Sequence, residues 1–99
     1  MITIIRSASI APGKIGDAIA FAHKITKYLQ DTHDMKLDIL MPIGGNPNRI
    51  AWLGHYENLA QWEGLLSKLM TDTDYVTAVA SNSASFLPGS VHDDIWRSI

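Results

Sequence analysis

The stretch RIAWLGHYENLAQWEGLLSKLMTDTDY, residues 49–75, decides the fold of this chain. Its first part, from Ile50 to Tyr56, is rich in branched and aromatic residues and predicts a β-strand. After Glu57 and Asn58 the apolar residues recur every three or four positions, which predicts an amphipathic helix. Because the apolar period changes within a few residues, a strand must run directly into a helix. The rest of the chain should supply the packing partners for this unit.

The residues on either side continue the alternation of strands and helices. In chain order, the apolar periods predict a strand at 2–10, a helix at 14–32, strands at 35–43 and 50–56, a helix at 59–71, a short helical segment at 75–86 and a strand at 91–99. The turn cluster GGNPN at 44–48 predicts a hairpin between the second and third strands. This order predicts a single domain at 1–99 with a ferredoxin-like βαββαβ fold. In that α+β fold, helices cover one face of a four-stranded antiparallel sheet.

The apolar residues of the strands exceed what one covered sheet face needs. The first strand carries isoleucine on both faces, and in the last strand Trp96 lies opposite Ile95. A sheet that is wet on one side should instead alternate between apolar and polar residues. We therefore predict that a second copy of the chain covers the free face, as a homodimer, since two-fold dimers are the commonest oligomers.

Composition excludes several classes of function. With 99 residues the chain makes one domain, and its net charge of −2 and pI near 6.0 argue against a nucleic-acid partner. It has no cysteine, which excludes disulfides, thiolate metal sites and thiol catalysis. No apolar run is long enough to span a membrane and no signal peptide is visible, so we expect a soluble cytoplasmic protein without a membrane partner.

Three residues of the central stretch could carry chemistry, and two of them have a structural alternative. Trp62 could form an aromatic wall over a flat substrate, or it could anchor its helix in the core. Asn58 could hold a substrate oxygen, or it could cap the helix that follows. His55 is the histidine best suited to acid–base work. It points to the opposite side from Trp52 and Tyr56, so it faces either the helices or the dimer seam.

Charged residues on the strands raise two further possibilities. Arg6 and Arg97 interrupt apolar strand faces, so each must either bind a carboxylate ligand or form an internal ion pair, which is the favoured interpretation. The candidate partners in such a pair are Asp38, Asp93 and Glu57. The run of His92, Asp93 and Asp94 does not predict a metal site, because alternate side chains of a strand face opposite ways.

Three segments resemble the dimeric α/β-barrel superfamily, which holds the antibiotic-biosynthesis monooxygenases and the NIPSNAP-like proteins. They are IAPGK at 10–14, WLGHYENLAQWE at 52–63 and FLPGSVHDDIWRSI at 86–99. The resemblance implies the homodimeric barrel. Its cofactor-free monooxygenases use an asparagine and a tryptophan four positions apart, followed by a tyrosine and an arginine. Asn58 and Trp62 match that spacing, and Tyr75 and Arg97 are the candidates for the other two.

The same resemblance argues against haem degradation, because the first strand lacks the asparagine that the haem-degrading members use. Two hypotheses therefore stand. One is a cofactor-independent monooxygenase-like enzyme, without metal or cofactor, that acts on an aromatic or polyketide-like molecule through His55, Asn58, Trp62, Tyr75 and Arg97. The other is a non-catalytic dimer that binds a small metabolite or acts as an interaction module. A cavity of ~300 Å³ or more beside Trp62 and Tyr75 would favour the enzyme, whereas packing shut by Phe21 and Phe86 would favour the binding protein.

Overall fold

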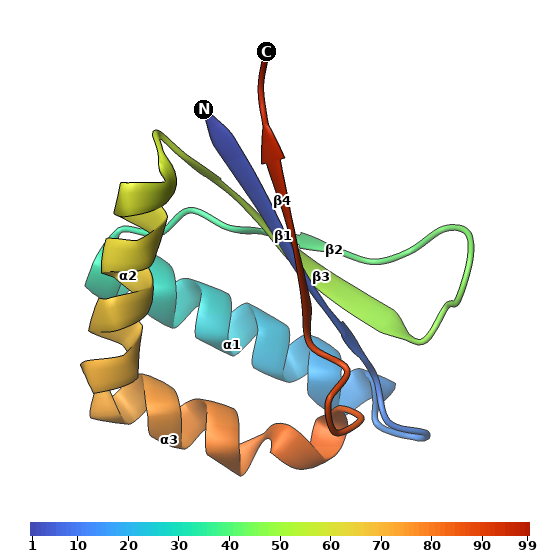
Figure 1. Cartoon of the computed structure of the whole chain (residues 1–99). Helices are drawn as coiled ribbons and strands as arrows, with labels where there is room; N and C mark the ends of the chain where they lie inside the picture. The colour runs from blue at the N-terminus through green and yellow to red at the C-terminus, as the bar shows by residue number, and fades with distance from the viewer.

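The computed structural model describes every residue from Met1 to Ile99. One antiparallel sheet, with the strand order β2-β3-β1-β4, is covered on one face by helices (Figure 1). The strands are β1 (Ile2–Ser9), β2 (Asp38–Leu40), β3 (Arg49–Tyr56) and β4 (His92–Arg97). The helices are α1 (Ile15–His33), α2 (Leu59–Thr71) and α3 (Thr73–Ser81), followed by the 3-10 turn η1 (Ser83–Ser85). The predicted ferredoxin-like fold and the β2–β3 hairpin are confirmed.

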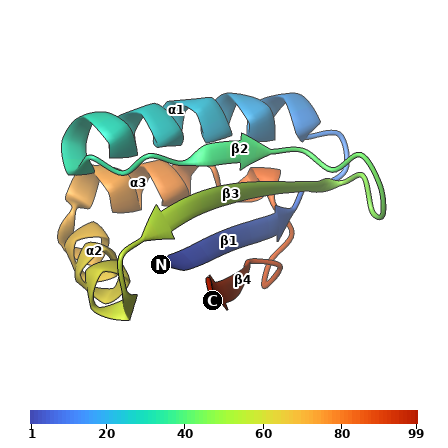
Figure 2. The ribbon, with the colours of Figure 1, turned by 90° about the horizontal axis from the view of Figure 1, so that it is seen from above.

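The strand register assigns each side chain to one face of the sheet. Figure 2 shows the strands side by side in the order β2, β3, β1 and β4. Arg6 lies opposite Trp52 on β3 and Asp93 on β4, and all three belong to the face under the helices, the inner face. Its neighbour Ile5 lies opposite Leu53 and Asp94 on the outer face. No helix covers the outer face.

The core lies between the inner face and the first two helices. Nine buried apolar residues form its main cluster: Ile2, Ile4, Phe21, Ile25, Leu29, Met35, Tyr56, Trp62 and Leu69. A smaller cluster of Ile10, Ala18, Ala22 and Ile50 closes the end of the sheet next to the start of α1. In contrast, every residue of β4 is exposed. None of the helices combines the length and apolar character needed to cross a bilayer.

The second strand is shorter than its predicted extent at 35–43. The chain leaves α1 through Asp34, whose left-handed backbone (φ 54°) ends the helix, and the amide of Met35 still donates to the carbonyl of Leu29. Met35 is therefore buried as part of the helix end and not in the ladder. Only Asp38 to Leu40 pair with β3.

A cluster around Asp72 ties the end of α1 to the junction of α2 and α3. Tyr28 Oη donates to Asp72 Oδ2 over 2.6 Å, and His33 Nε2 lies 2.7 Å from the same oxygen. The amide of Tyr75 donates to Asp72 Oδ1 over 3.1 Å, which caps α3. The Tyr28 hydroxyl, then His33 and the Tyr75 amide, lower the pKa of Asp72 to about 2. Asp72 also raises the pKa of the Tyr28 hydroxyl.

We expect Asp72→Asn to remove part of the acid sensitivity of folding. The folded pKa lies below the ordinary value of 3.8, so the charge of Asp72 stabilises the fold fully above about pH 5 and less as the pH falls toward 2. Loss of this charge should lower Tm by roughly 5 °C at pH 7 and by much less at pH 2. Thermal melts from pH 7 to 2 measure the difference. Asp31→Asn, which breaks the exposed Lys27–Asp31 pair, should leave the profile unchanged.

Candidate functional site

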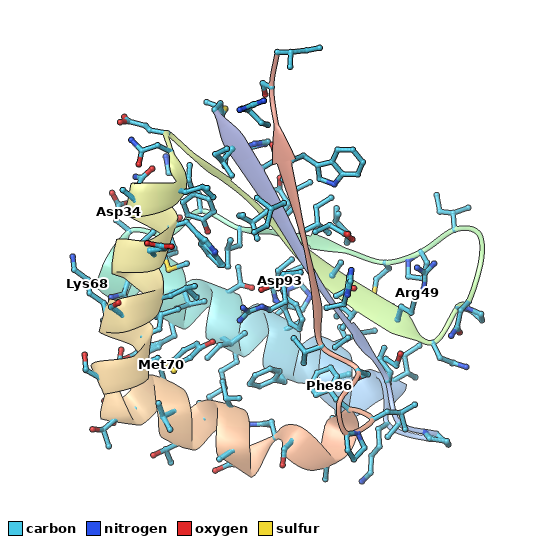
Figure 3. All side chains as sticks on the ribbon, viewed as in Figure 1. Asp34, Arg49, Lys68, Met70, Phe86 and Asp93 are labelled. Atoms are coloured by element: carbon cyan, nitrogen blue, oxygen red, sulfur yellow. The ribbon has the colours of Figure 1, made fainter.

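The helices do not fill the space above the inner face completely. A cavity of about 800 Å³ lies between the inner face of β1 and β3 and the three helices. Most of its wall is apolar, and its base includes Ile4, Ala8 and Gly54 from the strands. Phe21 and Phe86, whose ring centroids lie 5.8 Å apart, form part of the wall and do not close the cavity. Phe86 is labelled in Figure 3.

The cavity opens beside the connection from η1 to β4. Four lining residues of this connection are exposed, namely Leu87, Pro88, Gly89 and Val91, and so is Val79 on α3. Deeper in the cavity the lining residues Ile4, Ile25, Leu29 and Trp62 are buried. A volume of this size falls within the range that holds small-molecule ligands.

Aromatic side chains form a large part of the cavity wall. Tyr56 and Trp62 pack with ring centroids 5.0 Å apart, and both line the cavity together with Trp52 and Tyr75. Burial raises the pKa of the Tyr56 hydroxyl, and the nearby charge of Arg6 partly offsets that effect. The indole N–H of Trp52 is buried and has no acceptor within the protein. These rings present flat apolar surfaces with a few hydrogen-bonding groups at their edges.

Arg6 is the one charged side chain that lines the cavity. Its Nε donates to Asp93 Oδ1 over 2.7 Å, and its Nη2 donates to Oδ2 over 2.8 Å. The guanidinium carbon also lies 5.9 Å from the ring centroid of Trp62, within the range of a cation–π contact. Hydrogen bonding to Arg6 lowers the pKa of Asp93, and the same bond raises that of Arg6. The predicted internal ion pair is therefore present for Arg6, with Asp93 as its partner.

The structure brings together two of the five side chains predicted as a site, namely Trp62 and Tyr75, which both line the cavity. Asn58 caps α2, because its Oδ1 accepts from the amide of Gln61 over 2.9 Å, and it is not part of the cavity wall. The Gln61 side chain in turn accepts from the amide of Glu57 over 2.6 Å. The capping role predicted for Asn58 is confirmed.

The other two predicted site residues lie away from the cavity. His55 belongs to the outer face, exposed, with its Nδ1 3.0 Å from Thr3 Oγ1. The sequence left two sheet faces possible for His55, and the structure places it on the face that no helix covers. Arg97 ends β4, pairs in register with Ile2 and is exposed.

Trp52, Tyr56 and Asp93 are parts of the site that sequence reasoning did not single out as such. Alternation along β3 puts Trp52 and Tyr56 on one face, but only the pairing with β1 shows that this face is the inner one. Asp93 is recognisable only as a possible partner of Arg6, since the two residues lie at opposite ends of the chain. The β1–β4 register makes them direct neighbours.

Metal-ligating residues do not gather anywhere in the molecule. No group of three or more histidine, aspartate and glutamate side chains is placed to hold a metal ion. His92 and Asp94 lie on the outer face, 3.2 Å apart, whereas Asp93 between them turns to the inner face. This is the separation expected for adjacent residues of a strand.

Gly54 lies directly against the side chains of Tyr56 and Leu37. We therefore expect Gly54→Ala to destabilise the fold by about 1–2 kcal/mol. A Cβ at this position would lie 2.7 Å from Tyr56 Oη and 2.8 Å from Leu37 Cδ2, so both packed side chains would have to move. Gly64→Ala on α2 is the matched control, because nothing lies within 4 Å of its Cβ. That change should stabilise the fold by about 0.5–1 kcal/mol. Urea unfolding of the two variants measures the contrast.

Comparison with solved structures places this fold among known proteins. A NIPSNAP domain protein from Burkholderia xenovorans matches with a TM-score of 0.85 at 13% identity, over 100% of this chain and 95% of the other. A NIPSNAP family protein from Agrobacterium tumefaciens matches with a TM-score of 0.82 at 16% identity, over 97% and 86% of the two chains. A proposed antibiotic biosynthesis monooxygenase from Deinococcus radiodurans matches with a TM-score of 0.73 at 9% identity, over 99% and 92%.

No family model and no curated protein matches the sequence. At these identities the likeness shows the fold alone, and that fold is the predicted ferredoxin-like α+β arrangement. This chain therefore has the α+β fold shared by NIPSNAP proteins and antibiotic-biosynthesis-monooxygenase-like proteins.

Proposed function

We propose that this protein, with a fold shared by NIPSNAP and monooxygenase-like proteins, binds a flat, largely apolar small molecule in the cavity above the inner face. The cavity of about 800 Å³ carries this proposal, because it is apolar, partly open and walled by Trp62 and Tyr75. Aromatic walls favour planar ligands through stacking and edge contacts. Arg6 supplies the charged hydrogen-bond donor that would orient such a ligand.

The proposed assembly is a homodimer in which the outer faces of two copies pack together. This face carries the half-buried Ile5 and Leu53 at its centre, and Leu40 and Trp96 are 39% and 63% exposed beside them. Burial of ~800 Å² per partner would suit a stable interface. In such a dimer His55 would lie at the seam and not in the cavity.

We also propose that the protein is cytoplasmic, as expected from its sequence.

A second candidate function is oxygenation of the bound molecule without a cofactor. It is favoured by the position of Arg6 in the cavity wall, because its free N–H groups would donate hydrogen bonds to a ligand oxygen on which charge develops during the reaction. The monooxygenase-like neighbours in fold make this the reaction to test first. Of the residues predicted for catalysis, Trp62 and Tyr75 are retained as ligand contacts, whereas Asn58, His55 and Arg97 would have to act from outside the cavity.

Titration with 1,8-dihydroxyanthraquinone tests the binding proposal. Quenching of tryptophan fluorescence should saturate with a Kd in the micromolar range, because Trp52 and Trp62 both line the cavity. The corresponding anthrone tests the reaction. Oxygenation would convert its ring CH2 group to a carbonyl, with one atom of O2 retained and the other released as water. Oxygen uptake above the protein-free rate supports the enzyme, binding without uptake supports the binding protein, and a failure to bind contradicts both.

A further inference from the structure

The pairing of Arg6 with Asp93 determines the net charge that a ligand meets in the cavity. Arg6 lines the cavity and Asp93 does not, although the carboxylate of Asp93 holds one edge of the guanidinium. A guanidinium has five N–H groups, and this carboxylate accepts from two atoms of Arg6, Nε and Nη2. The N–H groups that remain are directed to no other hydrogen-bond acceptor of the protein, so Arg6 keeps donors for a ligand.

Both members of the pair stay charged at neutral pH. Their hydrogen bonds raise the pKa of Arg6 and lower the pKa of Asp93. The cavity therefore offers charged donors but no net positive charge. Both side chains are about one-third exposed, and Arg6 is part of the cavity wall, so a ligand in the cavity can reach its guanidinium.

We propose that Asp93 is a specificity-determining residue that makes the cavity select neutral ligands with a carbonyl or hydroxyl oxygen over carboxylates of the same shape. This inference rests on the proposed ligand-binding function of the cavity. A neutral oxygen gains a charge-assisted hydrogen bond from the free N–H groups of Arg6. A carboxylate must lose its hydration among apolar walls, and the positive charge that would compensate is already neutralised by Asp93.

The pair also has a purely structural role, since it joins β4 to β1 across the exposed edge of the sheet. A structural role alone would change stability without changing the ratio of affinities for two ligands of one shape. Selectivity is therefore the measurement that separates the two roles. Two naphthalenes substituted at the same ring position serve as probes, the neutral ketone 2-acetylnaphthalene and the anion 2-naphthoate.

The test compares the wild-type chain with Asp93→Asn and with Asp93→Glu, which keeps the charge. We expect the wild type to bind the ketone at least about tenfold more tightly than the naphthoate. Asp93→Asn should strengthen naphthoate binding by about tenfold and leave ketone binding within about threefold, whereas Asp93→Glu should retain the wild-type preference. Asp31→Asn removes a carboxylate from an exposed pair of the same kind and should change neither affinity.

Circular dichroism establishes that each variant is folded. If Asp93→Asn fails to fold, Asp93→Thr takes its place, because threonine is neutral and favours a β-strand. Equal affinity of the wild type for the two probes, or an unchanged preference in the folded neutral variant, would overturn the inference while ketone binding still supports the proposed function. If the wild type binds neither the ketone nor the anthraquinone, both the proposed function and this inference fail.

Discussion

Leu53→Lys is expected to convert the proposed dimer into a monomer, with at least a hundredfold weaker self-association. Leu53 lies at the centre of the outer face, between Asp38 on β2 and Ile5 on β1. In a monomer the new ammonium group would remain in water beside the Asp38 carboxylate, so the fold should tolerate it. In a dimer the same group would be buried against the apolar face of the second copy. Removal of a charge from water costs several kcal/mol in a protein interior.

Sedimentation equilibrium across the micromolar range measures this change directly. The wild type should sediment as a dimer of the 10.9 kDa chain and Leu53→Lys as a monomer with an unchanged circular dichroism spectrum. Met70→Lys is the matched control, because Met70 is 66% exposed on α2, on the other side of the sheet (Figure 3). That variant should remain dimeric. A wild-type chain that sediments as a monomer, or a dimeric Leu53→Lys, would show that the outer face is not the interface.

The elements of this fold are predictable because each has its own local signal. The strand-to-helix switch after Tyr56 appears as β3 and α2, joined by the Asn58 cap. The apolar residues of α1 recur at the spacing of one helical face, and those that are buried belong to that face. In each case the pattern needs only neighbours in sequence, so periodicity and capping chemistry are sufficient.

The composition of the site depends instead on contacts that are distant in sequence. The partner of Arg6 follows from the β1–β4 register, because three carboxylates were equally compatible with the sequence and only Asp93 lies opposite. The β1–β3 register decides that His55 faces away from the helices. An asparagine at position 58 suits both a substrate contact and a helix cap. In the structure its side chain accepts a hydrogen bond from the backbone amide of Gln61, which makes it the cap. Spacing that matches a motif therefore did not place Asn58 and Trp62 in one site.

The length of an edge strand is also poorly encoded. Residues 35–43 alternate well enough to predict a full strand, yet Met35 is held by the end of α1 and only the central residues reach β3. Leu37 likewise turns to the cavity wall. The end of α1 and the core compete with β3 for the residues of this segment, and that competition limits the strand to three residues. The alternation of apolar and polar residues does not reveal it.

Trp62→Ala is expected to destabilise the fold by about 3 kcal/mol and to weaken anthraquinone binding by at least about tenfold. Trp62 is 8% exposed and belongs to the main core cluster, where it packs against the Tyr56 ring and beneath the Arg6 guanidinium. Removal of its ring would join the space it occupies to the existing cavity. The loss of contacts lowers stability, and a wider cavity without its aromatic wall holds a planar ligand less well.

Trp62→Phe separates the two effects. Phenylalanine keeps an apolar ring in the core, so most of the stability should return, whereas the stacking surface for the ligand and the cation–π contact with Arg6 are reduced. Urea unfolding and ligand titration by calorimetry measure stability and affinity independently for both variants. If Trp62→Ala remains folded and binds the anthraquinone as tightly as the wild type, the ligand does not occupy this cavity. If affinity falls in both variants while Trp62→Phe retains nearly full stability, Trp62 contacts the ligand directly in addition to holding α2 on the sheet.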